Sequence, residues 1–291
     1  MSSKSIGMTG KVLARTGMCL LAATALTLPP ATPANAEPGF HPTIIRGTGR
    51  PAELRLAYQA TFANGSLDPN VDFLGAGPMV PGDPLIPDTN PTVSFSPGEA
   101  VVSVYRPLGL TPDDFPSESL WATPVNFGPG SVVRLSATFR APVGPLPGGG
   151  FAIGLVARTG AKDDVAPANE RIAITVNVRP DFLVRFGAAF GNVAPARVVL
   201  PDDVKNAIFS ATDPQPFMMD LTIDRAHETA TAKLTVIDQV FTVSFALSDF
   251  LADSGPAITA VGPGIAVNSN APGQTASVHV RDFRIYASSD G

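Results

Sequence analysis

Hydrophobic and polar residues alternate along much of the chain between Ser131 and Tyr286. In each run the apolar side chains occupy every second position, as in Val133, Leu135, Ala137 and Phe139, or in Ile172, Ile174, Val176 and Val178. A period of two residues places successive side chains on opposite sides of an extended strand. Each run therefore predicts a strand with one face for a core and one for water.

The same alternation predicts a long series of short strands separated by Gly, Pro and Asn. The expected ranges are 53–62, 93–95, 101–105, 119–122, 131–140, 151–158, 170–179, 181–186, 217–224, 229–237, 239–246, 257–261, 264–268 and 275–286. One or two short helices are expected in connections, at 202–209 and 247–252. The expected fold class is all-β, a two-sheet antiparallel β-sandwich.

The last expected strand contains a break in its alternation. The apolar set changes parity between Val280 and Phe283. One extra residue at Arg281-Asp282 accounts for the change, and an extra residue in one strand of an antiparallel pair is a β-bulge.

The N-terminus has the pattern of an export signal. A basic segment with Lys4, Lys11 and Arg15 precedes an apolar stretch over 18–28, and Ala34-Asn35-Ala36 matches an A-x-A cleavage site. The apolar stretch is shorter than the roughly 20 residues that span a bilayer. The sequence therefore predicts a Sec-type signal peptide over 1–36, cleaved after Ala36, and a secreted, periplasmic or cell-surface protein with no transmembrane segment.

The rest of the chain, 37–291, is expected to be a single β-sandwich domain with an irregular Pro/Gly-rich loop at 64–91. The loop contains four aspartates that suit calcium but follow no repeating loop spacing, and solvated loop acids are the favoured interpretation: Asp68, Asp72, Asp83 and Asp88. The single cysteine, Cys19, lies within the signal peptide. A cysteine-free mature chain excludes disulfides, cysteine nucleophiles and thiolate metal sites.

The charge of the chain argues against a nucleic-acid partner. Its formal net charge is −5, so a polyanion as long as a nucleic acid is repelled on average. Apolar residues make up 44% of the chain, which is too many for a disordered protein. Composition leaves the oligomeric state undetermined.

Five segments of the strand-rich region resemble one known fold family: 132–140, 150–155, 217–236, 264–267 and 278–285. Together they resemble the concanavalin A-like lectin/glucanase jelly roll, a group that includes laminin G-like modules. The resemblance implies two curved sheets in a jelly-roll sandwich, with ligands usually met on the concave sheet. It implies no particular function, because members include lectins, glycosidases, lyases and adhesion modules.

Enzymatic motifs of that group are incomplete in this sequence. No glutamate opens the Glu-x-Asp-x-x-Glu run of the glycosidases, and Asp220 and Asp224 on one strand face would be roughly 13 Å apart, too far for a hydrolytic acid pair. Lyases of the group carry an Arg-x-Glu-Leu-Arg strand, and the segment 50–55 has these residue types but with two residues instead of one between the first arginine and the glutamate. The three histidines are scattered: His41, His227 and His279. No catalytic residue, metal ligand or cofactor is therefore expected.

Ligand-binding candidates come from polar strand faces and from the single tryptophan. Arg134, Arg171 and Asn177 suit an anionic sugar, because guanidinium groups bind carboxylates through two hydrogen bonds. Trp121 offers an aromatic face to a sugar, although a core position is the alternative for it. The leading hypothesis is an exported non-catalytic binding module for carbohydrate or another cell-surface or extracellular ligand. The alternatives are a polysaccharide-degrading enzyme, lyase or glycoside hydrolase, and a structural or adhesion surface protein.

Overall fold

The computed structural model describes residues 53–63, 65, 73–77, 92–109, 117–122, 131–146, 148, 150–159, 171–178, 184–188, 197–247, 258–267 and 273–288. The predicted signal peptide at 1–36 lies outside these residues, as do all but the first residue of the predicted helix at 247–252 and most of the loop at 64–91. Within the described ranges, no helix is long and apolar enough to cross a membrane.

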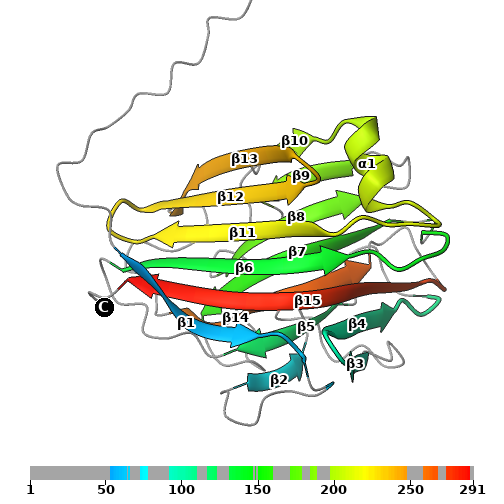
Figure 1. Ribbon diagram of the computed structural model, residues 1–291, viewed down its shortest axis with the longest axis horizontal. Coiled ribbons are helices and arrows are strands. Elements are labelled where there is room, and N and C mark those ends of the chain that lie inside the picture. Colours follow the sequence, from blue (N-terminus) through cyan, green and yellow to red (C-terminus); the bar gives the residue numbers. More distant parts are fainter. Residues whose placement is uncertain are drawn as a thin grey trace, which may run out of the picture. The chain divides into compact units, whose positions relative to one another are not determined.

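Sheet A has eight strands among the described residues, in the spatial order β13-β12-β11-β6-β15-β4-β3, with β1 also paired to β15 (Figure 1). Every pairing in it is antiparallel. Its strands are β1 (Leu54–Ala60), β3 (Thr92–Ser96), β4 (Glu99–Tyr105), β6 (Val132–Arg140), β11 (Phe217–Asp224), β12 (Thr229–Val236), β13 (Gln239–Ala246) and β15 (Thr275–Ser288).

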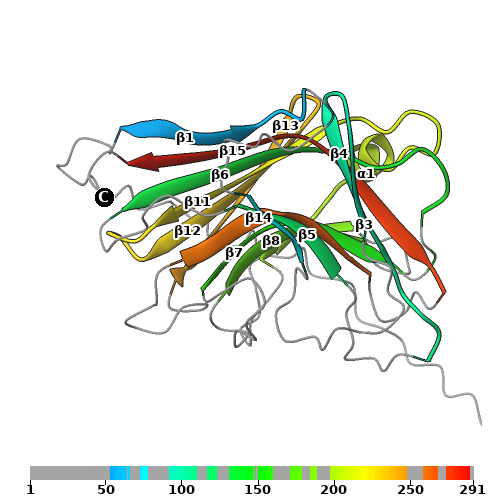
Figure 2. The same cartoon turned by 90° about the horizontal axis from the view of Figure 1, so that it is seen from below.

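Sheet B has seven strands among the described residues, in the order β10-β9-β8-β7-β14-β5-β2, and it is also antiparallel. Its strands are β2 (Phe73–Gly77), β5 (Ser117–Ala122), β7 (Phe151–Thr159), β8 (Arg171–Val178), β9 (Val184–Ala188), β10 (Arg197–Val199) and β14 (Ile258–Val267). In Figure 2 the two sheets form layers, and the strands of sheet B arch towards sheet A. The outer side of sheet B is therefore its concave side.

The chain crosses repeatedly between the layers. Strands β4, β5, β6 and β7 fall alternately in sheets A and B, and β14 in sheet B is followed by β15 in sheet A. Crossing connections of this kind distinguish a jelly roll from two stacked meanders. The expected fold class, a two-sheet antiparallel β-sandwich of jelly-roll type, is confirmed.

The core lies between the sheets and uses the apolar positions that alternation predicts. Phe139 and Ile223 from sheet A and Val176 from sheet B have no exposed surface. Phe139 and Phe217 are direct cross-strand partners, and their rings stack with centroids 5.6 Å apart. Aromatic pairs add about 0.5–1.5 kcal/mol to the effect of burial alone.

Strand β15 lies near the middle of sheet A and has a different partner along each half of one edge. Its first half, from Thr275 to Val280, pairs with β4, and its second half pairs with β1, while β6 runs along the other edge. The β15–β6 register shifts between Val280 and Asp282, which confirms the predicted bulge at Arg281-Asp282.

Two expectations about strand boundaries are wrong. The predicted strands at 257–261 and 264–268 are one continuous strand, β14, that runs through Gly262-Pro263. Proline lacks an N–H and usually interrupts a ladder. Here the pairing with β5 passes from Val261 to Gly264, while Gly262 and Pro263 keep partners in β7. One intact ladder is enough to hold the strand together. Strand β2 lies inside the range expected to be an irregular loop.

The helix expected at 202–209 is α1 (Asp202–Ile208). Val204 and Ile208, four residues apart, form its buried face. Asp203 accepts a hydrogen bond from Gln239 Nε2 at 2.8 Å, which ties α1 to the start of β13.

Candidate functional site

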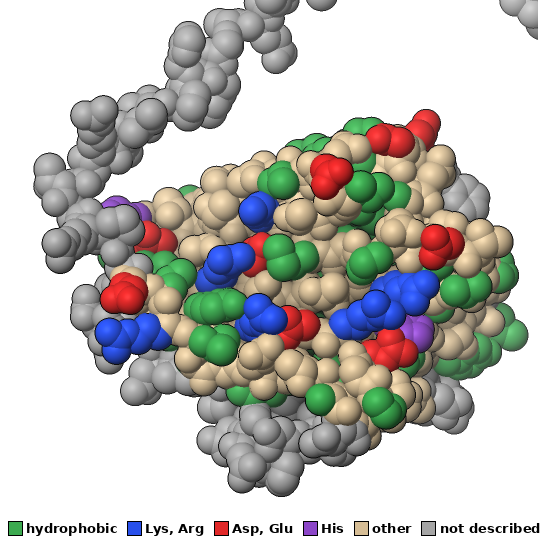
Figure 3. Space-filling model, viewed as in Figure 1, with side chains coloured by type: hydrophobic (Ala, Val, Ile, Leu, Met, Phe, Trp, Pro, Cys, Tyr) green, Lys and Arg blue, Asp and Glu red, His purple; other side chains and the backbone are tan. Residues whose placement is uncertain are grey.

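The outer face of sheet A, turned away from sheet B, carries charged side chains of both signs (Figure 3). Residues at alternate positions on the central strands face outwards because their neighbours fill the core. The outward basic residues are Arg134, Arg140, Lys233, Arg281 and Arg284, and the outward acidic residues are Glu99, Asp220, Asp224 and Asp282. Basic side chains thus slightly outnumber acidic ones on this face, although the chain has a net charge of −5.

One group of residues around Arg134 and Tyr286 forms what we call the central patch. It consists of Leu56, Gln59, Arg134, Asp220, Asp282, Arg284 and Tyr286, from strands β1, β6, β11 and β15. Register brings these strands together: Arg134 and Leu56 are both cross-strand partners of Tyr286, and Gln59 is the partner of Arg284.

Arg134 is held in place by Asp220. Its Nε and Nη2 both donate to Oδ1 of Asp220, at 2.8 and 2.6 Å. The Asp220 side chain is only 4% exposed, whereas that of Arg134 is 39% exposed, so the guanidinium group covers the carboxylate and remains accessible itself. The guanidinium carbon also lies 5.6 Å from the ring centroid of Tyr286, within cation–π range.

Arg284 interacts with two residues of its own strand, Asp282 and Tyr286. Its Nη2 lies 2.6 Å from Oδ2 of Asp282, and Gln59 Nε2 donates to Oδ1 of the same carboxylate at 3.2 Å. The pKa of the Arg284 guanidinium is raised, first by a side-chain hydrogen bond with Tyr286, against an opposing effect of burial, and further by the charge of Asp282. Arg284 therefore remains a cation at any physiological pH.

The central patch also has an apolar part. Leu56 is 52% exposed, which is high for a leucine, and it lies directly across from the half-buried Tyr286. A leucine and a phenol ring therefore adjoin two fixed guanidinium groups. The patch thus combines apolar surface with directed hydrogen-bond donors.

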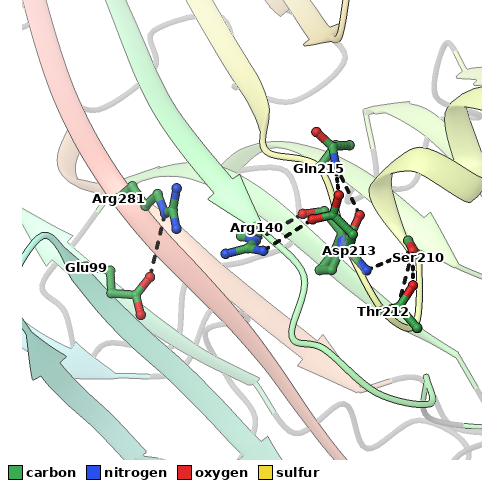
Figure 4. A network of polar contacts seen from close by, with 8 residues as sticks. Glu99, Arg140, Ser210, Thr212, Asp213, Gln215 and Arg281 are labelled. Atoms are coloured by element: carbon green, nitrogen blue, oxygen red, sulfur yellow. Dashed lines mark hydrogen bonds and ion pairs between the residues drawn. The ribbon is translucent and has the colours of Figure 1, made fainter.

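A second group, which we call the edge cluster, lies where β15 passes between β6 and β4. It consists of Glu99, Arg140, His279 and Arg281. Arg140 and His279 are direct cross-strand partners. Glu99 Oε1 lies 3.1 Å from His279 Nδ1, and its Oε2 lies 3.7 Å from Arg281 Nε. Figure 4 shows Arg281 and Arg140 between Glu99 on one flank and Asp213 on the other.

The residues singled out in the sequence fall in different sheets. Arg134 lies on β6 of sheet A, whereas Arg171 and Asn177 lie on β8 and Trp121 lies on β5, both in sheet B. Arg134 is therefore not part of one strand face with Arg171 and Asn177. Asn177 is half-buried and is the cross-strand partner of Arg185. Its role in ligand binding, like that of Arg171 and Trp121, stays a prediction.

The outward face of β7 and β8 is buried, although alternation predicted that it is exposed to water. Alternation assigned the positions around Thr175 to water, yet Ala173 has no exposed surface and Thr175 is 1% exposed. Ala152 and Val156 on β7, also on the outward side, are 3% and 0% exposed. Alternation assigns a side chain to one side of a sheet but says nothing about what covers that side.

The two aspartates considered as an acid pair both have structural partners. Asp220 binds Arg134, and Asp224 accepts hydrogen bonds from the backbone N–H of His227 at 3.0 Å and approaches its Nδ1 at 2.8 Å. Asp224 thereby closes the hairpin turn between β11 and β12. Among the residues that the structure describes, no three or more His, Cys, Asp or Glu side chains gather as metal ligands do.

Sequence reasoning missed most members of both groups. Arg134 and Asp220 are 86 positions apart, and Gln59 and Asp282 are 223 apart. A single sequence contains no signal for such pairings. The parity change at Arg281 was the one visible sign, because a bulge brings an additional side chain to one face.

No family model and no curated protein matches the chain. It is similar to lectin I-B4 from Griffonia simplicifolia, metal-free form, with 15% identity over 79% of this chain and 99% of that chain, at a TM-score of 0.48. It is also similar to the endo-1,3-β-glucanase from Streptomyces sioyaensis, with 12% identity over 83% and 99% of the two chains, at 0.48. Peanut lectin with a 9-residue peptide is similar as well, with 11% identity over 81% of this chain and 98% of that chain, at a TM-score of 0.46. These low values assign no ligand, activity or residue role to the chain.

Proposed function

We propose that this protein is an exported, non-catalytic binding module that engages carbohydrate through the central patch of sheet A. The observation that carries the proposal is the juxtaposition of Tyr286 and Leu56 with the guanidinium groups of Arg134 and Arg284. A pyranose ring has an apolar C–H face bordered by hydroxyl groups. Aromatic and aliphatic side chains suit the first, and fixed hydrogen-bond donors suit the second.

The rigidity of the patch supports binding. Asp220 holds Arg134, and Asp282, which itself accepts a hydrogen bond from Gln59, holds Arg284, so both donor groups have set orientations before a ligand arrives. All of these side chains project from antiparallel strands rather than from loops. A site on rigid elements loses less conformational entropy on binding.

The export part of the proposal rests on the basic segment, the apolar stretch and the Ala34-Asn35-Ala36 site at the N-terminus. Mass spectrometry of protein recovered outside the cytoplasm tests it. A mature chain that begins at Glu37 supports export, and an uncleaved chain confined to the cytoplasm contradicts it.

Binding can be tested with a glycan array followed by titration calorimetry on the strongest hit. Tyr286→Ser removes the aromatic surface and is expected to weaken binding about tenfold or more, as loss of a central aromatic contact usually does. Tyr105→Ser is the matched control, because Tyr105 is a half-buried tyrosine on β4 of the same sheet, outside the central patch. Its affinity should match that of the unaltered protein.

The outcomes separate the alternatives. Glycan binding that survives Tyr286→Ser but is lost with Asn177→Ala would move the site to the concave face of sheet B and overturn the central patch. Release of soluble sugar products would identify an enzyme instead. Retention on cells with no glycan bound on the array would favour a structural or adhesion protein.

A further inference from the structure

The edge cluster contains two arginines without a close ionic partner among the residues that the structure describes. Arg281 Nε lies 3.7 Å from Glu99, and Arg140 Nη2 lies 3.8 Å from Asp213. Both contacts are longer than a hydrogen bond. In the central patch, by contrast, Arg134 and Arg284 approach their carboxylates to 2.6 Å. The charges of Arg140 and Arg281 are therefore only weakly compensated.

The bulge in β15 is the reason that these charges adjoin. Val280 and Phe283 both face the core, and two residues separate them instead of one. Arg281 and Asp282 consequently both lie on the outer side, where regular alternation would place a single side chain. The additional residue adds a cation to the face that already carries His279 and Arg140.

Arg140 is oriented by a neutral group. Its Nε donates to the carbonyl oxygen of Pro214 at 3.0 Å. The loop that carries this carbonyl is braced, since Asp213 N–H donates to Ser210 Oγ at 3.0 Å and Gln215 Nε2 donates to Asp213 Oδ2 at 2.9 Å (Figure 4). The guanidinium group is thus fixed without being neutralised, and its side chain is 31% exposed.

Glu99 neutralises only part of this cluster. It faces His279 and Arg281 together, and its side chain is 25% exposed against 43% for Arg281. Asp213, beside the edge cluster, lies 3.8 Å from Arg140, and Glu99 lies 3.7 Å from Arg281, so among the described residues neither carboxylate makes a short contact with these guanidinium groups. A carboxylate or sulfate group from outside could form with Arg140 and Arg281 the short hydrogen bonds that Glu99 and Asp213 do not form.

We infer that the edge cluster is an anion subsite in which Arg140 and Arg281 bind a carboxylate or sulfate group borne on a polysaccharide. The inference rests on the proposed function and narrows its ligand to an acidic glycan. Because the chain carries a net charge of −5, binding depends on these local cations against an overall repulsion. Added salt should therefore weaken it.

Affinity electrophoresis through gels that contain polygalacturonate, dextran sulfate or neutral dextran tests the subsite. The double variant R140Q/R281Q is expected to lose about tenfold or more in affinity for an acidic polymer, because charge-assisted hydrogen bonds are the stronger kind. Arg55→Gln is the matched control, since Arg55 is 71% exposed on β1 and approaches Glu53 only to 3.9 Å. It should migrate like the unaltered protein.

A second pair of variants separates directed hydrogen bonds from simple charge attraction. R140K/R281K keeps both charges but loses the forked geometry. We expect it to bind the acidic polymers markedly more weakly than the unaltered protein. Equal binding by the lysine and arginine forms, or by R140Q/R281Q and the unaltered protein, would overturn the subsite.

Two further comparisons separate a free anion from a polysaccharide-borne one, and separate failure of the subsite from failure of the proposed function. Competition by inorganic sulfate at the concentration of polymer-borne sulfate would show a site for free anions and overturn the polysaccharide assignment. Glycan binding lost with Tyr286→Ser but unchanged in R140Q/R281Q would leave the proposed function standing and remove the subsite. Acidic-polymer binding that depends on Arg140 and Arg281 but not on Tyr286 would support the anion subsite and contradict carbohydrate binding through the central patch.

Discussion

Arg134 donates two hydrogen bonds to a single oxygen of Asp220, from Nε at 2.8 Å and from Nη2 at 2.6 Å. The two residues lie on neighbouring strands but are diagonal neighbours, since Asp220 faces Ser136 and Arg134 faces Thr222. The carboxylate is almost fully buried, so its charge depends on this one guanidinium group among the residues that the structure describes.

Arg134→Ala should therefore destabilise the protein more than other arginine substitutions on this face. The variant leaves a buried carboxylate without its cation, and we expect a loss of about 2–3 kcal/mol, below the value for fully buried pairs because Arg134 is 39% exposed. Urea unfolding measures it. Arg281→Ala is the control, with an expected change within about 0.5 kcal/mol. Equal effects of the two variants would contradict this account of the pair.

Deletion of one residue in β15 tests the bulge. Removing Arg281 restores regular alternation between Val280 and Phe283, so every core side chain keeps its side of the sheet. Removing Arg284 instead forces either Phe283 or Ile285 out of the core. Both deletions remove one arginine, yet we expect the Arg281 deletion to fold with a Tm within a few degrees of the unaltered protein. The Arg284 deletion should fail to unfold cooperatively, and a reversed order would contradict the bulge.

The turn between β12 and β13 contains a strained residue. Ile237 has a φ of 51°, a region that β-branched residues avoid, and its side chain is 59% exposed. Ile237→Gly should relieve about 1 kcal/mol of strain and raise Tm by about 2–4 °C in a thermal scan. Val240→Thr, which also removes an exposed apolar side chain in the same hairpin, should give no increase. A gain from both variants would assign the effect to surface hydrophobicity instead.

The pH dependence of α1 follows from one exposed pair. The pKa of Asp202 lies below its ordinary value of 3.8, because Lys205 Nζ donates to its Oδ1 at 2.6 Å and adds a positive charge nearby. A lowered carboxyl pKa means that the interaction is present above the unfolded value and is lost as pH falls through the folded one. Lys205→Gln should raise the Asp202 pKa towards 3.8 in an NMR titration. Lys233→Gln, on sheet A, should leave it unchanged.

Alternation predicted the strands well because burial between two sheets imposes a period of two on each strand. The ranges 217–224 and 239–246 match β11 and β13 at both ends. Alternation failed at β14, where Gly262-Pro263 breaks the pattern locally but β7 supplies partners across it. Local sequence signals the loss of an N–H and cannot signal that a neighbouring strand compensates for it.

The binding surface was less predictable than the strands. Arg134 was identified as an outward residue, but it was grouped with Arg171 and Asn177 on the basis of residue type. Which polar faces meet depends on strand order and register, and these depend on contacts between distant segments. Tyr286 and Gln59 join Arg134 only because β15 and β1 close the sheet beside β6.

The position of β15 has a consequence for the order of folding. The last strand that the structure describes is a neighbour of β1, β4 and β6 at once, and it is the one partner of β1 among the described strands, so β1 stays unpaired until the ribosome has made β15. Sheet A cannot assemble step by step from its N-terminal side. A nascent chain that stops short of residue 275 keeps both edges of the missing strand unpaired and is open to proteolysis and aggregation until synthesis is finished.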